Sequence, residues 1–210
     1  MRSLLPARLA SSTAQRLTAA SLLAGFAAGI DGTSTFIVFP AIRDDLANGD
    51  TASATWILTI VGITSAAVLL QAGRLADRFG HNRILVVSAL TATTASFLSA
   101  VSPTLGFLVG ARGLQAAALA GLTVSSIANL VRESEPSKLG AALGRWGFWT
   151  ATAGVLGPML ASLFVEFASW RWMFAISAPV ALAVALLAWP SWSTEHPSSK
   201  RGVIDYLGTL

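Results

Sequence analysis

The stretch GRLADRFGHNR, residues 73–83, stands between two runs of sequence that are almost wholly apolar. It contains two Gly, three Arg, one Asp and one His. Charged side chains are costly inside a lipid bilayer and Gly weakens a helix, so the stretch predicts a polar loop outside the bilayer. Its two flanks are therefore expected to be membrane spans.

The composition of the chain is typical of a membrane protein. Of its 210 residues 54% are hydrophobic and 11% are charged, with a mean hydropathy of +0.66; a soluble domain carries about 25% charged residues. The basic residues are scattered between apolar runs, which argues against nucleic acid as a partner of this chain of net charge +4. With no Cys and two isolated His, the sequence predicts no metal site and no cofactor.

Six apolar stretches are long enough to cross a bilayer, which takes about 17–25 residues in a helix. They are residues 17–40, 52–71, 84–101, 105–131, 146–165 and 172–189. The predicted fold is an all-α membrane protein with six transmembrane helices. Its predicted segments are an N-terminal segment (1–16), a six-helix bundle (17–189) and a segment leading toward a seventh span (190–210).

The basic residues also predict how the chain is oriented in its membrane. If the N-terminus is cytoplasmic, the inner segments carry Arg2, Arg8, Arg16, Arg74, Arg78, Arg83, Arg132, Lys138, Arg145, Lys200 and Arg201, and the outer segments carry Arg43 and Arg171. Cytoplasmic loops are enriched in Lys and Arg. We therefore expect a multi-pass protein of the plasma (inner) membrane with both termini of this chain in the cytoplasm.

The pattern Gly73-x-Leu-Ala-Asp-Arg-x-Gly80 resembles the loop signature of the major facilitator superfamily, which lies between the second and third spans. The resemblance implies the N-terminal half of that fold, with two inverted three-helix repeats. It also implies a conformational latch at Gly73, Asp77, Arg78, Gly80 and Arg83, with Asp77 and Arg78 as its charges. The alternative is that these charges only set the topology.

Two other spans resemble the fourteen-span drug:proton antiporter branch of the family. Asp31 and Pro40 match a motif of the first span. Arg112 and Gln115 match an Arg-containing motif of the fourth span, although Ala116 replaces its usual Gly. The resemblance implies a role for Asp31, Arg112 and Gln115 in proton coupling or substrate binding.

The fifth span carries a third motif. Gly144, Gly157 and Pro158 keep the spacing of the antiporter signature, whereas Ala153 and Ala161 replace two of its glycines. Small residues let helices approach closely and Pro bends a helix. The resemblance implies a hinge and seal for the cavity; the alternative is plain close packing.

Asp31 and Arg112 lie at similar depths. Asp31 is nine residues before Pro40, about 14 Å inward, and Arg112 is seven residues after Leu105, about 10 Å inward. We expect both to face the central cavity, coupled directly or through water and substrate. Ionisable groups within spans are usually functional, so Asp31 is predicted to carry protons or to pair with cationic substrates. The alternative is a structural ion pair that fixes helix packing.

The sequence therefore predicts a proton-coupled transporter that exports small amphipathic or cationic compounds by alternating access. It predicts no enzyme, because phosphate-binding loops and hydrolase motifs are missing from the sequence. Two alternatives stay open: a six-span permease subunit driven by a separate ATPase, and a non-transporting half-transporter that acts as a partner protein.

The expected partners are the lipid bilayer, protons and a small-molecule substrate. Major facilitators bind substrate between two six-span halves, and this chain has six spans. A further partner is therefore expected, either a C-terminal half missing by truncation or a second chain. Truncation is the favoured interpretation.

Overall fold

The computed structural model describes the backbone of residues 7–192 and the side chains of residues 13–192. Its long helices are α1 (Ala7–Leu46), α3 (Trp56–Phe79), α4 (His81–Ala100), α5 (Leu105–Glu133), α6 (Leu139–Phe167) and α7 (Arg171–Ala188). The short ones are α2 (Thr51–Ala54), η1 (Pro136–Lys138) and η2 (Trp189–Ser191). Residues 7–192 contain no strand, and six helices are long and apolar enough to cross a membrane. The predicted all-α fold with six spans is confirmed; the lead toward a seventh span lies outside the described residues.

The opening stretch differs from its prediction as a loop. Residues 73–79 complete the last turns of α3, and α4 begins directly at His81. Gly80 alone joins the two helices, with φ 102° and ψ 137°. Arg, Leu, Ala and Phe all tolerate a helix, so charge by itself does not end one. The break falls where the backbone needs a conformation that favours glycine.

We predict that Gly80→Ala destabilises the protein by about 1–2 kcal/mol, because a Cβ is strained at positive φ. Gly62, in the exposed middle of α3, has nothing within 4 Å of a built Cβ and provides the matched control. Gly62→Ala is expected to be neutral or slightly stabilising. Denaturant unfolding of the purified protein measures both, and equal midpoints for the two variants would contradict the prediction.

The helix contacts repeat with a two-fold pattern. α1 packs on α6 and α7, and α5 packs in the corresponding way on α3 and α4. α4 and α7 pack on each other, as do α1 and α5. Exchanging α1, α3 and α4 with α5, α6 and α7 preserves these pairs, as expected for two inverted three-helix repeats.

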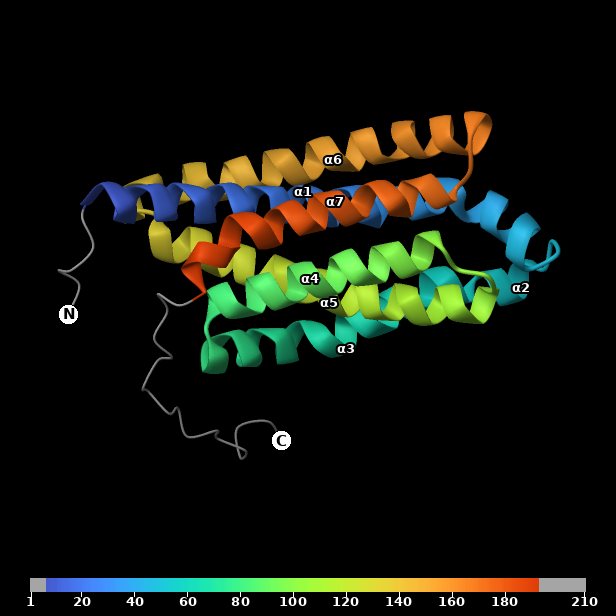
Figure 1. Ribbon diagram of the computed structural model, residues 1–210, viewed down its shortest axis with the longest axis horizontal. Helices are drawn as coiled ribbons and strands as arrows, with labels where there is room; N and C mark the ends of the chain where they lie inside the picture. Colours follow the sequence, from blue (N-terminus) through green and yellow to red (C-terminus); the bar gives the residue numbers. More distant parts are fainter. Residues whose placement is uncertain (1–6, 193–210) are drawn as a thin grey trace.

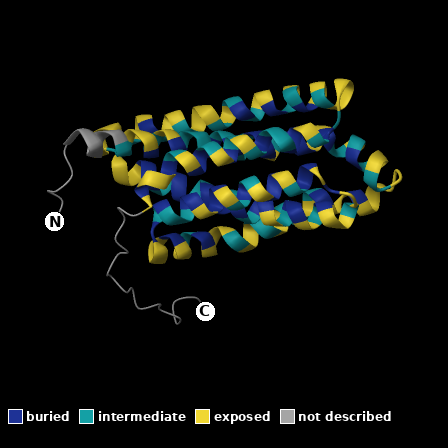
Figure 2. Ribbon diagram, in the orientation of Figure 1, coloured by how far each residue is buried: buried dark blue, intermediate teal, exposed yellow. Residues whose placement is uncertain are grey.

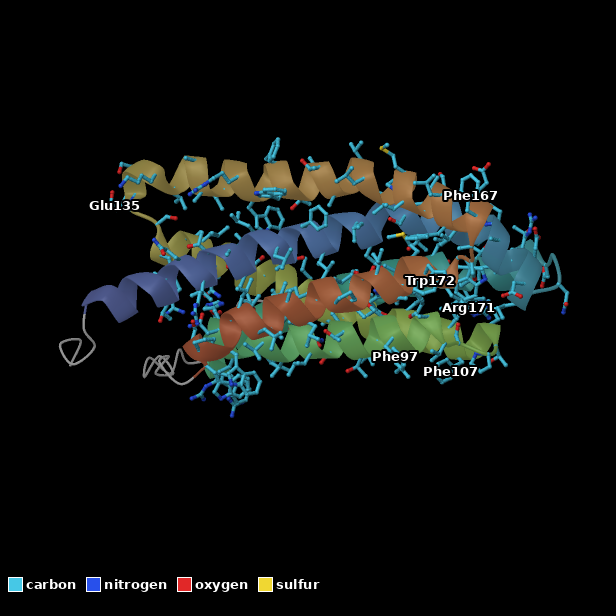
Figure 3. All side chains as sticks on the ribbon, turned by 45° about the horizontal axis from the view of Figure 1, so that its top comes forward. Phe97, Phe107, Glu135, Phe167, Arg171 and Trp172 are labelled. Atoms are coloured by element: carbon cyan, nitrogen blue, oxygen red, sulfur yellow. The ribbon has the colours of Figure 1, made fainter. Side chains whose placement is uncertain are left out.

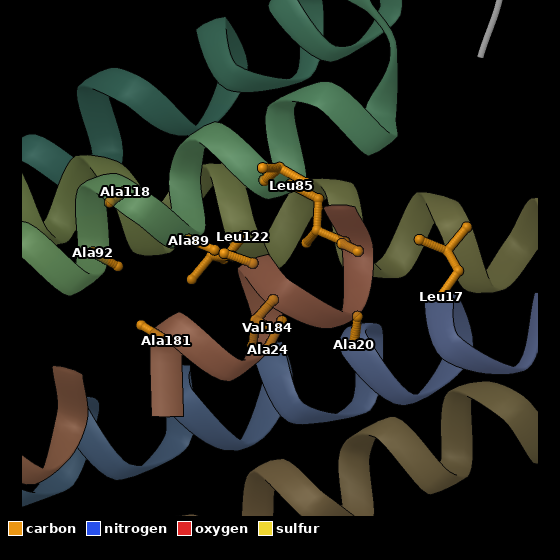
Figure 4. Packing of buried hydrophobic residues seen from close by; sticks show 13 residues of the cluster. Leu17, Ala20, Ala24, Leu85, Ala89, Ala92, Ala118, Leu122, Ala181 and Val184 are labelled. Carbon is orange, nitrogen blue, oxygen red and sulfur yellow. The ribbon is translucent and has the colours of Figure 1, made fainter. Parts of the chain in front are cut away.

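The core lies between four of the six spans. Within the most apolar 18 residues of each span, about half of the residues are buried in α1, α4 and α5. The buried share is 11% in α3 and 17% in α6. α6 and α3 lie at opposite edges of the bundle (Figure 1), and buried residues gather on the helices between them (Figure 2). One core cluster is built mainly from Ala, Val and Leu of α1, α4, α5 and α7 (Figure 4). Its small residues let these four helices approach closely.

The six-helix bundle has two ends, the Gly80 end and the Arg171 end. The Gly80 end also holds Glu135, the start of α1 and the end of α7. The Arg171 end holds the α4–α5 turn at Ser102 and the α6–α7 turn. Figure 3 shows Glu135 and Arg171 at these opposite ends.

Candidate functional site

A buried ion pair joins the two central helices. Arg112 of α5 donates from Nη1 to Asp31 Oδ1 of α1 at 2.6 Å. The Arg112 side chain is 1% exposed and that of Asp31 is 5% exposed. A charge buried to this degree is tolerated when it is paired and hydrogen-bonded. The structure therefore places the two intramembrane charges of the sequence in direct contact.

Gln115, one turn along α5 from Arg112, ties both charges together. Its Oε1 accepts from Arg112 Nη1 at 2.7 Å, and its Nε2 donates to Asp31 Oδ1 at 3.0 Å. The same Nε2 donates to Ser96 of α4 at 3.0 Å. With the Gln115 amide reversed, its NH2 group would face the guanidinium, and two donors would meet. The network therefore fixes the orientation of the Gln115 amide.

The other side of the guanidinium is held by α1 and α7. Arg112 Nη2 donates to Thr35 Oγ1 at 3.0 Å, and Thr35 itself donates to the Asp31 carbonyl at 3.1 Å. The guanidinium carbon lies 5.3 Å from the ring centroid of Phe174, within range of a cation–π contact. Arg112 Nε is buried with no hydrogen-bond partner in the part of the chain that the structure describes. Three helices, α1, α4 and α5, thus supply this polar cluster of Asp31, Thr35, Ser96, Arg112 and Gln115, and α7 packs Phe174 against it.

The two charges of this cluster depend on each other. Arg112 and Gln115 both donate to the Asp31 carboxylate. Removing the charge of either Asp31 or Arg112 would leave the other buried without its counter-ion, which is strongly destabilising.

The orientation of the pair differs from the expectation that both side chains face a central cavity. Both are buried inside the six-helix bundle, Asp31 against Arg112 and Gln115 of α5, and Arg112 also against Phe174 of α7. The exposed positions beside them are Gly32 and Phe36 on α1, with Phe36 63% exposed, and Leu114 on α5. Depth along a helix predicted the level of the two charges, but not the side of the helix on which they lie.

Four further aromatic and polar residues of the apolar runs lie in different surroundings. Phe36 and Trp56 are exposed, whereas Asn129 is buried on α5. Trp149 of α6 packs edge-on against Phe26 at 6.4 Å between centroids. These two rings help to line an apolar groove of about 420 Å³ between α1, α6 and α7, completed by Ala19, Leu22, Leu23 and Leu187.

The predicted latch residues lie at the Gly80 end. The Asp77 carboxylate pairs with His81 Nε2 at 3.3 Å, and Arg78 lies over the Phe79 ring at 5.2 Å. Arg83 Nε donates to the carbonyl of Trp192 at 3.4 Å, which joins the start of α4 to the residue after η2. Gly73 is loosely packed, because its nearest neighbour would lie 3.8 Å from a built Cβ. The contacts of Asp77 and Arg78 are thus made within the α3–α4 connection.

The glycines of the fifth span divide into two kinds. A Cβ at Gly157 would meet Ser34 Oγ and, at 2.9 Å, the Ile30 carbonyl oxygen of α1. A Cβ at Gly144 would meet nothing within 4 Å. Pro158 lies inside α6, which continues to Phe167. Gly157 therefore serves the α1–α6 contact, and Gly144 lies on an open face.

The sequence analysis missed part of this arrangement. Gly25 and Gly29 of α1 complete the contact with α6, since a Cβ at either would clash with Thr150. The four-residue spacing of the two glycines is the sequence pattern that could have predicted this contact, because small residues four apart share one face of a helix. Ser96 and Phe174 carry no such signal, since only the tertiary fold brings them to Arg112.

A family model described as Major Facilitator Superfamily matches residues 21–204. The chain belongs to the major facilitator superfamily. Its family and its six apolar helices identify it as a membrane transporter and not an enzyme.

Several relatives of this transporter have names that refer to drug resistance. It is 35% identical over 184 residues to the puromycin resistance protein pur8 of Streptomyces alboniger, covering 86% of this chain and 36% of that protein. It is 30% identical over 194 residues to the multidrug export protein EmrB of Haemophilus influenzae, covering 92% and 38%. The chain thus spans little more than a third of the length of these relatives.

Solved structures show the same fold. A bacterial homolog of the human lysosomal transporter Spinster, in an inward-facing and unoccupied conformation, aligns with a TM-score of 0.68 at 16% identity, over 88% of this chain and 43% of that one. A D-xylose-proton symporter aligns with a TM-score of 0.63 at 17% identity, over 86% and 50%.

Proposed function

We propose that this transporter exports small amphipathic or cationic compounds in exchange for protons, and that Asp31 carries the proton. The observation that carries the proposal is the buried Asp31–Arg112 pair, whose hydrogen bonds join α1, α4 and α5. A carboxylate between paired helices can couple protonation to their arrangement. The names of the relatives support the substrate class.

Exposed apolar side chains on the helices that carry the pair support a hydrophobic substrate. Phe36 of α1 and Leu114 of α5 are exposed large side chains. On α6, which packs on α1, Val155 and Met159 are 65% and 60% exposed. Aromatic and aliphatic side chains of this kind line sites for apolar ligands. We propose that exposed apolar side chains of α1, α5 and α6 contribute one wall of the substrate site.

We further propose that this chain acts as the N-terminal half of a two-half transporter. It covers little more than a third of its relatives, and its two edge helices bury few of their residues. Halves of this family rock against each other to give alternating access. The basic residues at the Gly80 end support a cytoplasmic location for that end.

The test is transport by the protein expressed from its native gene and reconstituted into liposomes. We expect an imposed pH gradient to drive movement of a cationic dye such as ethidium, and a protonophore to stop it. ATP without a gradient is expected to drive none. Transport that requires ATP would instead favour the permease-subunit alternative, and transport indifferent to the protonophore would exclude proton coupling.

A further inference from the structure

We infer that Asp45, at the end of α1, is a positioning residue for the Asp31–Arg112 pair and acts on it through Trp170 and Phe174. The inference rests on the proposed function insofar as the pair carries protons. It concerns a group of contacts at the Arg171 end, which we call the clasp: Asp45, Ser102, Trp170 and Arg171.

The clasp joins three connections between helices. Asp45 Oδ2 accepts from Arg171 Nη1 at 2.7 Å and from Trp170 Nε1 at 3.0 Å. Arg171 Nη2 donates to the Ser102 carbonyl at 3.2 Å, and its guanidinium carbon lies 4.3 Å from the Trp170 ring centroid. A single carboxylate therefore fixes the entry to α7 relative to the end of α1 and the α4–α5 turn.

An unbroken set of contacts leads from the clasp to the buried pair. Trp170 is 4% exposed, and its ring meets that of Phe174 edge-on at 6.0 Å between centroids. Phe174, one turn further along α7 and 2% exposed, lies under the Arg112 guanidinium. Arg112 holds Asp31. The side chains from Trp170 to Asp31 are all buried, and the Asp45–Arg171 bridge at the other end of the set is partly exposed and charge-assisted.

The geometry makes the position of Phe174 depend on Asp45. Trp170 stands at the first residue before α7, so its hydrogen bond to Asp45 sets where α7 begins and how its first turn is rotated. A rotation of that turn would move the Phe174 ring relative to Arg112. The surroundings of Arg112 are therefore the direct readout of a change at Asp45.

A neighbouring carboxylate provides a matched control. Asp44 is also at the end of α1 and also pairs with an arginine, Arg43, at 2.7 Å. That pair is local to α1, and Asp44 is 61% exposed. Asp44→Asn removes the same charge from the same turn of α1 without touching Trp170 or Arg171.

The first measurement is the NMR resonance of the Arg112 Nε–H group in arginine-labelled protein, assigned by its loss in Arg112→Lys. This proton is sensitive to the nearby Phe174 ring. We expect Asp45→Asn and Trp170→Phe to shift the resonance and Asp44→Asn to leave it unchanged, with Asp45→Glu restoring it in part. An unmoved resonance in Asp45→Asn would overturn the inference.

The second measurement is proton-driven transport by the same variants. Couplings of this kind change rates by about 2- to 30-fold. We expect Asp45→Asn to lower kcat within that range with little change in KM, and to add nothing to the effect of Phe174→Leu. Fully additive effects would overturn the inference. Because the resonance requires no transport, a shifted Arg112 signal in a protein without proton-driven transport would reject the proposed function and retain the positioning role.

Discussion

Asp31→Asn is expected to abolish transport driven by a pH gradient while the protein stays folded in the membrane. Asn cannot exchange a proton in the relevant range, although its side chain has the size of Asp and still accepts a hydrogen bond from Arg112. The measurement is dye transport in liposomes, with folding checked by circular dichroism and size-exclusion chromatography. Unchanged transport would remove Asp31 from the mechanism.

A double-mutant cycle separates this role from a purely structural ion pair. Breaking a buried pair by neutralising one partner costs about 3–5 kcal/mol, because the other charge is left unpaired. We therefore expect Asp31→Asn and Arg112→Gln each to lower the stability, and the double variant to lose less than either. Denaturant unfolding in detergent gives the stabilities.

Transport by the double variant then decides between the two roles. If Asp31 carries protons, the double variant recovers stability but remains inactive. If the pair only fixes helix packing, transport returns together with stability. Arg43 and Asp44 form an exposed pair on the same helix, and their neutralisation is expected to change stability little.

The six spans were predictable because each is apolar all round and long enough to cross the bilayer. The pairing of Asp31 with Arg112 could be predicted in part from the sequence, because counting residues from the ends of the spans placed both side chains at a similar depth in the membrane. Rise along a helix carries no information about rotation around it. The side on which the pair lies, and its contacts with Ser96 and Phe174, depend on how α4 and α7 pack.

The 73–83 stretch shows a second limit of sequence reasoning. Its charges indicated correctly where an apolar run ends, but the chain stays helical up to Phe79 and turns at one residue. Polarity reports the boundary of the apolar layer, whereas the end of a helix is set by the backbone. Within residues 73–83, Gly80 alone has the positive φ that the turn requires.

Gly29→Ala and Gly157→Ala are expected to destabilise the protein by about 1–3 kcal/mol each, the range found when a packed core is overfilled. A Cβ at Gly29 would meet the backbone carbonyl oxygen of Thr150 and, at 3.0 Å, the Ala153 Cβ. At Gly157 it would meet the Ile30 carbonyl oxygen at 2.9 Å. Backbone atoms cannot rotate away, so α1 and α6 would have to separate along their shared contact.

The same substitution at Gly147 provides the control within α6. A Cβ there meets nothing within 4 Å, and Ala favours a helix over Gly by up to about 1 kcal/mol. Gly147→Ala is therefore expected to match or exceed the original stability in denaturant unfolding. Equal losses at Gly147 and Gly157 would mean that helix packing does not distinguish the two glycines. A loss confined to Gly29 and Gly157 would assign these two positions to the close approach of α1 and α6, because overpacking acts only where backbone atoms block the added methyl group.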